Sequence, residues 1–383
     1  MNHLPQTRVL ILSDAIAHRN GVGSYYCDLV DQLRARLPGV DLICPTMAGE
    51  NPFQGRAFPL PGDPTQKIYL PRLRPLLRLI KQTRPQAVVA PIPGPFGLAG
   101  LLIARWRRIP FIAGFHTRYD DLIELSLGKG LGKRLRIGAG YWQKLFFRSA
   151  AAVVANSREM ASTARSEGAA RVDLVGTPLH RCFLNSPVKP AVGKLSTVVF
   201  AGRLAPEKNI AHFTDAAAQL NHLRFVVAGD GPMKPLVQRR AEALANLEYA
   251  GWCDREKLMK IMDKSDLLVL PSKVEGFGTI ALEAMARRIN VLVSPACGLL
   301  GWPLLAGSVF VQGTEESLAE AIHRIARMGK DTRIRSARRA CLASRRFSQA
   351  TVDHWAALIH GMTMRRPAEE TSNPAWRTQT VFS

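Results

Sequence analysis

Two glutamates flank a pair of glycines in the stretch from residue 271 to residue 286. Glu275 and Glu283 are separated by seven residues, which include Gly276 and Gly278. The glycines let the backbone approach a ligand without a Cβ in the way, and a helix that begins after them offers unpaired N–H groups to an anion. Carboxylates beside such a turn typically bind sugar hydroxyls, because they accept two hydrogen bonds and repel a misplaced phosphate. The pattern indicates a site for a phosphate with a sugar beside it; the alternative is two solvated glutamates near a helix start.

A second group of residues suited to phosphate lies earlier in the chain. Residues 197–209 read as an apolar strand followed by Gly202, Arg203 and Lys208. Two cations at one strand end suit a diphosphate, because arginine contacts it as a fork and lysine as a point charge. Shortly afterwards Gly229 again follows an apolar strand.

The elements that position these residues are strands, glycine turns and helices in strict alternation. Residues 266–270 read Asp-Leu-Leu-Val-Leu, a run typical of a buried parallel strand, and a helical pattern follows Gly278. This alternation predicts a parallel sheet with helices on both faces.

The first half of the chain contains the same order of strand, glycines and helix. The apolar run 8–13 is followed by Gly21, Gly23 and a helical pattern, the opening of a nucleotide-binding-like unit, although a plain turn would read the same way. The strand 111–115 ends at His116, where an open α/β sheet places ligand-facing groups. A lone histidine is also common as a satisfied structural group, so both interpretations of His116 stay open.

Length and charge limit the possible partners. The chain of 383 residues is long enough for two domains, each with its own core. It carries 52 Lys+Arg against 30 Asp+Glu, a formal charge of +22, which implies a negatively charged partner: nucleic acid, an anionic membrane surface or a phosphorylated substrate. The six cysteines show neither zinc spacing nor a disulfide framework, and the first residues contain no signal-peptide pattern, so we expect a reduced, cytoplasmic protein.

Taken together, these motifs resemble the retaining glycosyltransferases of family 4, strongly from Gly202 to Ala286 and more loosely before His116. The resemblance implies the α/β GT-B fold, in which two Rossmann-like domains with doubly wound parallel sheets face one cleft. It also implies that Glu275 binds the transferred sugar, that Glu283 binds the ribose, and that His116 faces the reacting carbon from the opposite domain. The catalytic residues implied are His116, Glu275, Arg203 and Lys208. The donor-binding residues implied are Gly21, Gly23, Gly202, Arg203, Lys208, Gly229, Gly276, Phe277, Gly278, Thr279 and Glu283.

No cofactor and no metal ion are expected, because the chain contains no Asp-x-Asp pair. The charge of the leaving diphosphate would instead be met by Arg203, Lys208 and helix N–H groups. The sequence departs from the family pattern after Ala286, where residues 287–290 read Arg-Arg-Ile-Asn, and again at 294–301, where the usual glycine-rich turn is replaced.

The predicted domains are an N-terminal acceptor-binding domain at 1–188 and a nucleotide-sugar-binding domain at 189–346. A helix at 347–365 crosses back to the first domain, and a disordered tail occupies 366–383. We predict a long surface connection between residues 45 and 75. Residues 87–104 carry no charge; prolines and glycines there favour a strand, a loop and a helix from about Phe96 over a membrane span.

Three basic segments are relevant to the acceptor. Residues 72–84 form a basic amphipathic helix, and residues 129–148 mix basic with aromatic residues, which suits either an interfacial helix or an ordinary helix with a solvated basic face. Residues 331–346 carry six arginines, and this basic face is either simply solvated or part of a membrane-binding patch.

We predict transfer of a hexose from a donor of the UDP-glucose or GDP-mannose type to a membrane lipid such as diacylglycerol, by a peripheral protein on the cytosolic face of the membrane. The alternatives are a soluble or polysaccharide acceptor, sugar-phosphate synthesis, and a non-catalytic GT-B module that binds ligands or nucleic acid. Nucleic acid is not expected as a partner, because no RNA-recognition motif accompanies the charge.

Overall fold

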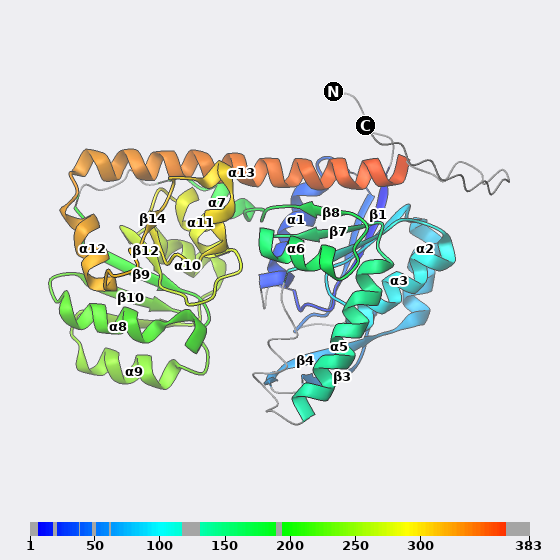
Figure 1. Ribbon diagram of the computed structural model, residues 1–383, viewed down its shortest axis with the longest axis horizontal. Helices are drawn as coiled ribbons and strands as arrows, with labels where there is room; N and C mark the ends of the chain where they lie inside the picture. Colours follow the sequence, from blue (N-terminus) through cyan, green and yellow to red (C-terminus); the bar gives the residue numbers. More distant parts are fainter. Residues whose placement is uncertain are drawn as a thin grey trace, which may run out of the picture.

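The computed structural model describes residues 7–17, 21–37, 39–47, 51–60, 63–116, 131–188 and 194–364. Two parallel sheets lie side by side, each with helices on both faces, and one long helix spans them (Figure 1). This is the arrangement of two Rossmann-like domains that the sequence predicts.

The first sheet has six parallel strands in the order β2-β1-β5-β6-β7-β8. Its central strands are buried on both faces, as expected of runs such as Val88-Val89 and Val153-Val154 that lack polar residues. Helix α1 and the long helix α13 cover one face, and α2, α3, α5 and α6 cover the other. The strands are β1 (Arg8–Leu12), β2 (Gly39–Ile43), β5 (Ala87–Ala90), β6 (Phe111–Phe115), β7 (Ala152–Ala155) and β8 (Val172–Leu174), and the helices are α1 (Gly21–Leu33), α2 (Leu73–Thr83), α3 (Pro95–Arg107), α5 (Leu131–Arg148) and α6 (Arg158–Ser166).

The second sheet also has six parallel strands, in the order β11-β10-β9-β12-β13-β14. Helices α8, α9 and α12 pack on one face, while α7, α11 and part of α13 pack on the other. The strands are β9 (Thr197–Ala201), β10 (Arg224–Ala228), β11 (Leu247–Gly251), β12 (Leu267–Leu270), β13 (Asn290–Val293) and β14 (Phe310–Val311). The helices are α7 (Arg181–Asn185), α8 (Ile210–Gln219), α9 (Lys234–Ala243), α10 (Arg255–Met262), α11 (Thr279–Ala286) and α12 (Leu318–Arg327), with short 3-10 turns η1 (Pro206–Lys208), η2 (Gly298–Gly301) and η3 (Pro303–Leu305).

The predicted surface connection at residues 45–75 is wrong. Much of it forms an antiparallel hairpin of β3 (Gln54–Leu60) and β4 (Asp63–Pro71), which leads into α2. The hairpin buries Tyr69 against the core of the first domain. The prolines of its strands, Pro59 in β3 and Pro64 and Pro71 in β4, obscured the strand pattern; they are tolerated because each strand of a two-stranded sheet has one unpaired edge.

The uncharged segment 87–104 is divided between β5, a loop and α3, whose first residue is Pro95. Within the ranges listed above, no helix combines the length and the apolar character that a membrane crossing requires. The strand and the helix expected from the prolines and glycines of this segment are both present.

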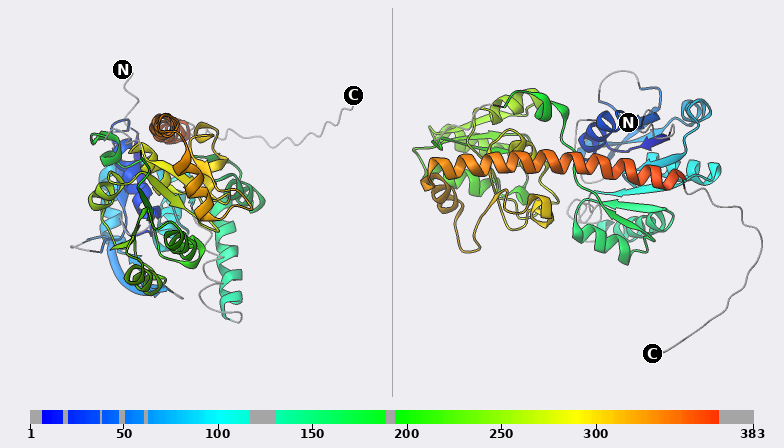
Figure 2. Two further views of the ribbon diagram at one scale, coloured as in Figure 1. Left: turned by 90° about the vertical axis from the view of Figure 1, so that its left-hand side faces the viewer. Right: turned by 90° about the horizontal axis from the view of Figure 1, so that it is seen from above.

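Helix α13 (Lys330–Met364) connects the two domains (Figure 2). It begins well before the predicted start of the crossing helix at residue 347 and passes through that position without a break. In the second domain, Phe347 stacks on Phe277 with ring centroids 5.6 Å apart; in the first, the Trp355 Nε1–H donates to the Tyr25 hydroxyl at 2.7 Å. The predicted tail at 366–383 lies outside the described residues.

Some residues of the basic segments stabilise the fold, either by packing in the core or by hydrogen bonding. In α5, Trp142, Phe146 and Phe147 pack in the core of the first domain, so these aromatics are not available to a membrane, whereas Tyr141 is exposed. In α13, buried Arg333 donates to the Ala326 carbonyl oxygen at the end of α12, 3.0 Å away.

Candidate active site

The turn after β12 brings one acidic and one basic predicted residue together. The Lys208 Nζ lies 2.8 Å from Oε2 of Glu275, and the Ser272 hydroxyl donates to the same oxygen at 3.2 Å. Both side chains of the ion pair are largely buried, with exposed fractions of 22% and 14%. Since Lys208 ends η1, two separate predicted motifs meet at this point.

Two glycines shape the same turn in different ways. Gly278 precedes the first residue of α11, Thr279, and has φ 88°, a left-handed conformation that side-chain-bearing residues rarely adopt. Gly276 is exposed, and a Cβ built on it would meet nothing within 4 Å. The backbone at Gly276 is therefore open to a ligand on the side that a side chain would occupy.

The segment that departs from the family pattern supports this turn. The Gly298 N–H donates to the Glu275 carbonyl oxygen at 2.9 Å, and the Ser294 hydroxyl donates to the Ser272 carbonyl oxygen at 2.6 Å. A Cβ on Gly298 would lie 2.0 Å from the Gly276 carbonyl oxygen. Residues 294–298 thus stabilise the backbone of the Glu275 turn through these hydrogen bonds.

A further glycine contact joins the ends of β9 and β10. Gly229 has φ 148°, and a Cβ there would lie 1.9 Å from the Gly202 carbonyl oxygen. The next residue after Gly202, Arg203, is exposed at this edge of the sheet. The Lys273 N–H donates to the Glu207 carbonyl oxygen at 2.8 Å, which ties η1 to the turn after β12.

Phe277 differs from its neighbours in the predicted donor-binding set. Its ring is buried and faces the core, where it stacks on Phe347 and lies 6.3 Å from the Trp302 ring. Packing therefore occupies the Phe277 ring, and its carbonyl oxygen accepts from the Cys297 thiol at 3.4 Å.

In the first domain, Gly21 and Gly23 form the first turn of α1, and His116 follows β6. The His116 ring packs on Tyr25 and Tyr26, with the Tyr25 centroid 4.6 Å away, and its Nε2 is 2.9 Å from the Tyr26 hydroxyl oxygen. Burial lowers the pKa of His116 to about 4, so the ring is neutral at neutral pH. The motifs of the sequence did not identify Tyr25 and Tyr26 as site residues. The available signal was that this aromatic pair comes just after Gly21 and Gly23.

Asp14 is another functional candidate that the sequence did not reveal. Its carboxylate accepts hydrogen bonds from the N–H groups of Phe96 at 2.8 Å and Gly97 at 3.0 Å, at the start of α3. Burial raises the pKa of Asp14 to about 7, although these backbone bonds oppose that shift. Asp14 therefore fixes the start of α3 beside the loop that follows β1.

An ion pair joins the domains next to Glu283. Arg255 of α10 donates to both carboxylate oxygens of Asp28 of α1, at 2.5 and 2.7 Å. Burial raises the pKa of Glu283 to about 8; the charge of Asp28 adds to the shift and that of Arg255 opposes it. The contact thus brings α1, whose first turn contains Gly21 and Gly23, close to α11, which follows the glycine turn after β12.

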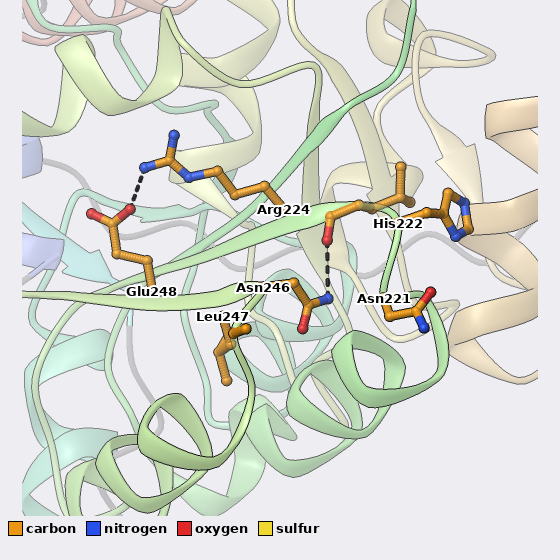
Figure 3. A pocket seen from close by; sticks show the side chains of 8 residues that line it. Asn221, His222, Arg224, Asn246, Leu247 and Glu248 are labelled. Atoms are coloured by element: carbon orange, nitrogen blue, oxygen red, sulfur yellow. Dashed lines mark hydrogen bonds and ion pairs between the residues drawn. The ribbon is translucent and has the colours of Figure 1, made fainter.

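A hollow elsewhere on the second domain does not belong to this site. It measures about 480 Å³ and is lined by residues 221–224 and 245–248, at the amino-terminal ends of β10 and β11 (Figure 3). An ion pair between Arg224 and Glu248 lies at its side. Ligands of open α/β sheets bind at the carboxyl ends of the strands, the edge opposite this hollow.

The arrangement is suited to a phosphorylated sugar ligand. The second domain contributes cations, open backbone at a helix start, the Glu275 carboxylate and the Glu283 carboxyl group, which burial keeps largely protonated at neutral pH; the first domain contributes the neutral imidazole of His116. In the part of the chain that the structure describes, no three metal-ligating side chains gather into a group that could hold an ion. The predicted contacts with the donor and the absence of a metal stay predictions.

Two family models match the chain, one over each half. The model described as Glycosyltransferase Family 4 matches residues 19–178, and the model described as Glycosyl transferases group 1 matches residues 185–340. The matched residues include every predicted site residue.

Curated relatives and solved structures agree with these matches. A GDP-mannose-dependent alpha-mannosyltransferase of Mycolicibacterium smegmatis is 28% identical over 76% of this chain and 80% of its own length. A GDP-mannose-dependent alpha-(1-6)-phosphatidylinositol dimannoside mannosyltransferase of Mycobacterium tuberculosis is 29% identical over 37% of this chain and 38% of its own. Several other matches are also partial, since the chain spans between 25% and 57% of those proteins. The structure of Anabaena HepE in complex with UDP and glucose superposes with a TM-score of 0.64 at 18% identity, over 92% of this chain and 98% of that one.

Proposed function

The chain belongs to the family 4 glycosyltransferases of GT-B fold, and from that membership we propose that it moves a hexose from a nucleotide-sugar to a hydroxyl group of an acceptor, with retention of configuration. The C1–O bond of the donor breaks and its electron pair goes to the diphosphate. The acceptor oxygen bonds to C1 on the same face, and its proton passes to the released diphosphate.

The observation that carries the proposal is the Lys208–Glu275 pair beside the open Gly276 backbone. In the absence of donor, each charge neutralises the other. A bound diphosphate attracts Lys208, and the hydroxyls of the transferred hexose donate to the Glu275 carboxylate. Arg203 supplies a second cation, so charge that develops on the leaving group is stabilised without a metal ion.

The remaining predicted residues complete the donor site. The N–H groups at the start of α11, including that of Thr279, face the phosphate, and Glu283 accepts from the ribose hydroxyls. His116 approaches the reacting carbon from the first domain as a neutral group, which avoids repulsion with positive charge that develops on the sugar.

We place the acceptor at an anionic membrane surface. In α2, Leu73 and Leu77 are exposed beside Arg74, Arg78 and Lys81; in α3, Leu98, Leu102 and Trp106 are exposed beside Arg105 and Arg107. Both helices cover the same face of the first sheet. Exposed apolar residues among basic ones suit attachment to anionic headgroups, and one relative is named for a phosphatidylinositol mannoside substrate.

The test incubates the purified protein with radiolabelled UDP-glucose or GDP-mannose and a lipid extract, and counts label in the organic phase. We expect label from one donor, and a loss of at least about 100-fold in kcat/KM for Lys208→Ala. Lys260→Ala, which removes an exposed lysine on α10, is the matched control and should transfer normally.

Two results would contradict parts of the proposal. Normal turnover of Lys208→Ala would remove the diphosphate role of Lys208. Label that stays entirely in the aqueous phase, on a sugar, polysaccharide or phosphate acceptor, would replace the lipid by a soluble acceptor while leaving transfer itself intact.

A further inference from the structure

The ring of His116 has one nitrogen bonded and one nitrogen unused. Nε2 is 2.9 Å from the Tyr26 hydroxyl oxygen, while Nδ1 is buried and has no hydrogen-bond partner among the described residues. Two neutral tautomers are possible, and they differ in which nitrogen carries the proton.

Counting unsatisfied groups decides between the tautomers. If Tyr26 donates to Nε2, the proton of His116 lies on Nδ1, and this N–H is the one buried group left without a partner. If Nε2 donates to Tyr26 instead, the Nδ1 lone pair is unsatisfied, and so is the hydroxyl proton of fully buried Tyr26, which makes no second hydrogen bond to a described residue in this arrangement. Each buried unsatisfied polar group costs about 1 to 3 kcal/mol, so the first arrangement is favoured.

The neighbouring tyrosine, Tyr25, has hydrogen-bond partners other than His116, and one of them lies on helix α13. The Tyr25 hydroxyl donates its one proton to the Gly176 carbonyl oxygen at 2.9 Å and accepts from Trp355 Nε1–H at 2.7 Å, so this proton is not donated to His116. The Trp355 ring also meets the Tyr26 ring edge-on, with centroids 6.0 Å apart.

Two glycines make this arrangement possible. A Cβ on Gly176 would lie 2.3 Å from the Phe347 ring and would push α13 away. A Cβ on Gly114 would lie 2.9 Å from the Tyr26 hydroxyl oxygen, which occupies the space beside β6. The close approach of α13, α1 and β6 is therefore built into the backbone.

We propose that Tyr26 and Trp355 are positioning residues that hold His116 in its Nδ1–H tautomer, so that this N–H is presented as a donor to an oxygen of the bound substrate. The tautomer depends only on the contacts given above. The substrate oxygen, from a sugar hydroxyl or a phosphate, rests on the proposed function.

The test reads the tautomer directly by two-bond ¹H–¹⁵N correlation spectra of the histidine rings in the full chain at about pH 7. His116→Gln identifies the His116 signals by their loss. We expect the Nδ1–H pattern in the unaltered protein, and a mixture of tautomers in Tyr26→Phe, which keeps the ring and removes the hydroxyl. Tyr69→Phe, a substitution in β4, is the matched control and should leave the His116 signals unchanged.

Kinetics supply the second measurement. Tyr26→Phe should lower kcat roughly tenfold with little change in KM for the donor, because the ring stays in place but its donor N–H is no longer fixed. Trp355→Phe should give a smaller loss of the same kind, since it removes the hydrogen bond to Tyr25 and alters the ring contact that supports Tyr26.

Three outcomes overturn the proposal. An Nε2–H pattern in the unaltered protein, or an unchanged His116 spectrum in Tyr26→Phe, would show that Tyr26 does not set the tautomer. A changed tautomer with normal kcat would show that the Nδ1–H does not serve the reaction. The spectra decide the positioning claim even if the chain transfers no sugar, so the failure of the proposed function is seen separately.

Discussion

Arg255 of α10 and Asp28 of α1 form a bidentate ion pair across the boundary between the two domains. Asp28 has an exposed fraction of 4% and Arg255 one of 23%, so the pair is shielded from water and salt. It lies beside Glu283, whose pKa both partners influence. The relative position of the two glycine turns therefore depends on this contact as well as on α13.

Asp28→Asn should lower the free energy of unfolding by about 2 to 3 kcal/mol, because it leaves the Arg255 charge without its partner in a largely buried position. Urea unfolding monitored by circular dichroism measures the change. Glu248→Gln, which breaks the pair with Arg224 on an exposed surface, is the control and should cost less than about 1 kcal/mol. Equal effects of the two substitutions would mean that the interdomain pair contributes no more than a surface pair.

Glu283 should make the protein less stable as the pH rises. Its pKa is raised from 4.5 to about 8 in the folded protein, so the folded state binds a proton that the unfolded state releases between these values. The stability that comes from the protonated form is present below about pH 4.5 and is lost as the pH approaches 8.

Compared with Glu283→Gln, the unaltered protein should therefore lose stability across this range, by at most about 1.4 kcal/mol per pH unit. Urea unfolding of both proteins at several pH values measures the difference. A difference that stays constant with pH would show that Glu283 is ionised in the folded state throughout.

Gly276→Ala should weaken binding of the nucleotide without affecting stability. The new Cβ meets no protein atom within 4 Å, so the fold can accept it, but it projects into the space that we assign to the donor. We expect about a tenfold or larger loss of affinity for UDP or GDP by calorimetry, with the free energy of unfolding changed by less than about 0.5 kcal/mol.

Gly229→Ala provides the contrasting case for this prediction. Its Cβ would lie 1.9 Å from the Gly202 carbonyl oxygen at a positive φ, so this variant should be strongly destabilised. Unchanged nucleotide affinity in a folded Gly276→Ala protein would place the donor elsewhere.

Trp106→Ala combined with Leu102→Ala should weaken attachment to vesicles that contain anionic lipid, because these exposed side chains lie among the arginines of α3. Sedimentation with the vesicles at low and high salt measures attachment, and high salt should reduce it for the unaltered protein. Trp252→Ala removes an equally exposed tryptophan from the second domain, 60% against 61%, and should have no effect. Equal losses for both variants, or no attachment at low salt, would exclude this face of α2 and α3 as the membrane contact.

The fold class and most elements could be predicted because their signals are local. Apolar runs such as residues 267–270 are buried on both faces of a sheet, and the glycines after them mark the turns. The hairpin of β3 and β4 was not predicted, because Pro59 in β3 and Pro64 in β4 interrupt the alternation that identifies strands, and Pro71 ends it. The aromatic residues of α5 were ambiguous, since a core face and a membrane face have the same composition.

The sequence by itself determined the two strand, glycine turn and helix units and the candidate residues Lys208 and Glu275, since those patterns depend on neighbours in the chain. Only the tertiary structure decided that Phe277 faces the core and that Tyr26 meets His116, 90 residues away. It also decided that Arg255 pairs with Asp28, at a separation of 227 residues. Such contacts arise where two domains and the crossing helix pack together, and no periodicity or local composition encodes which distant side chains will share a buried boundary.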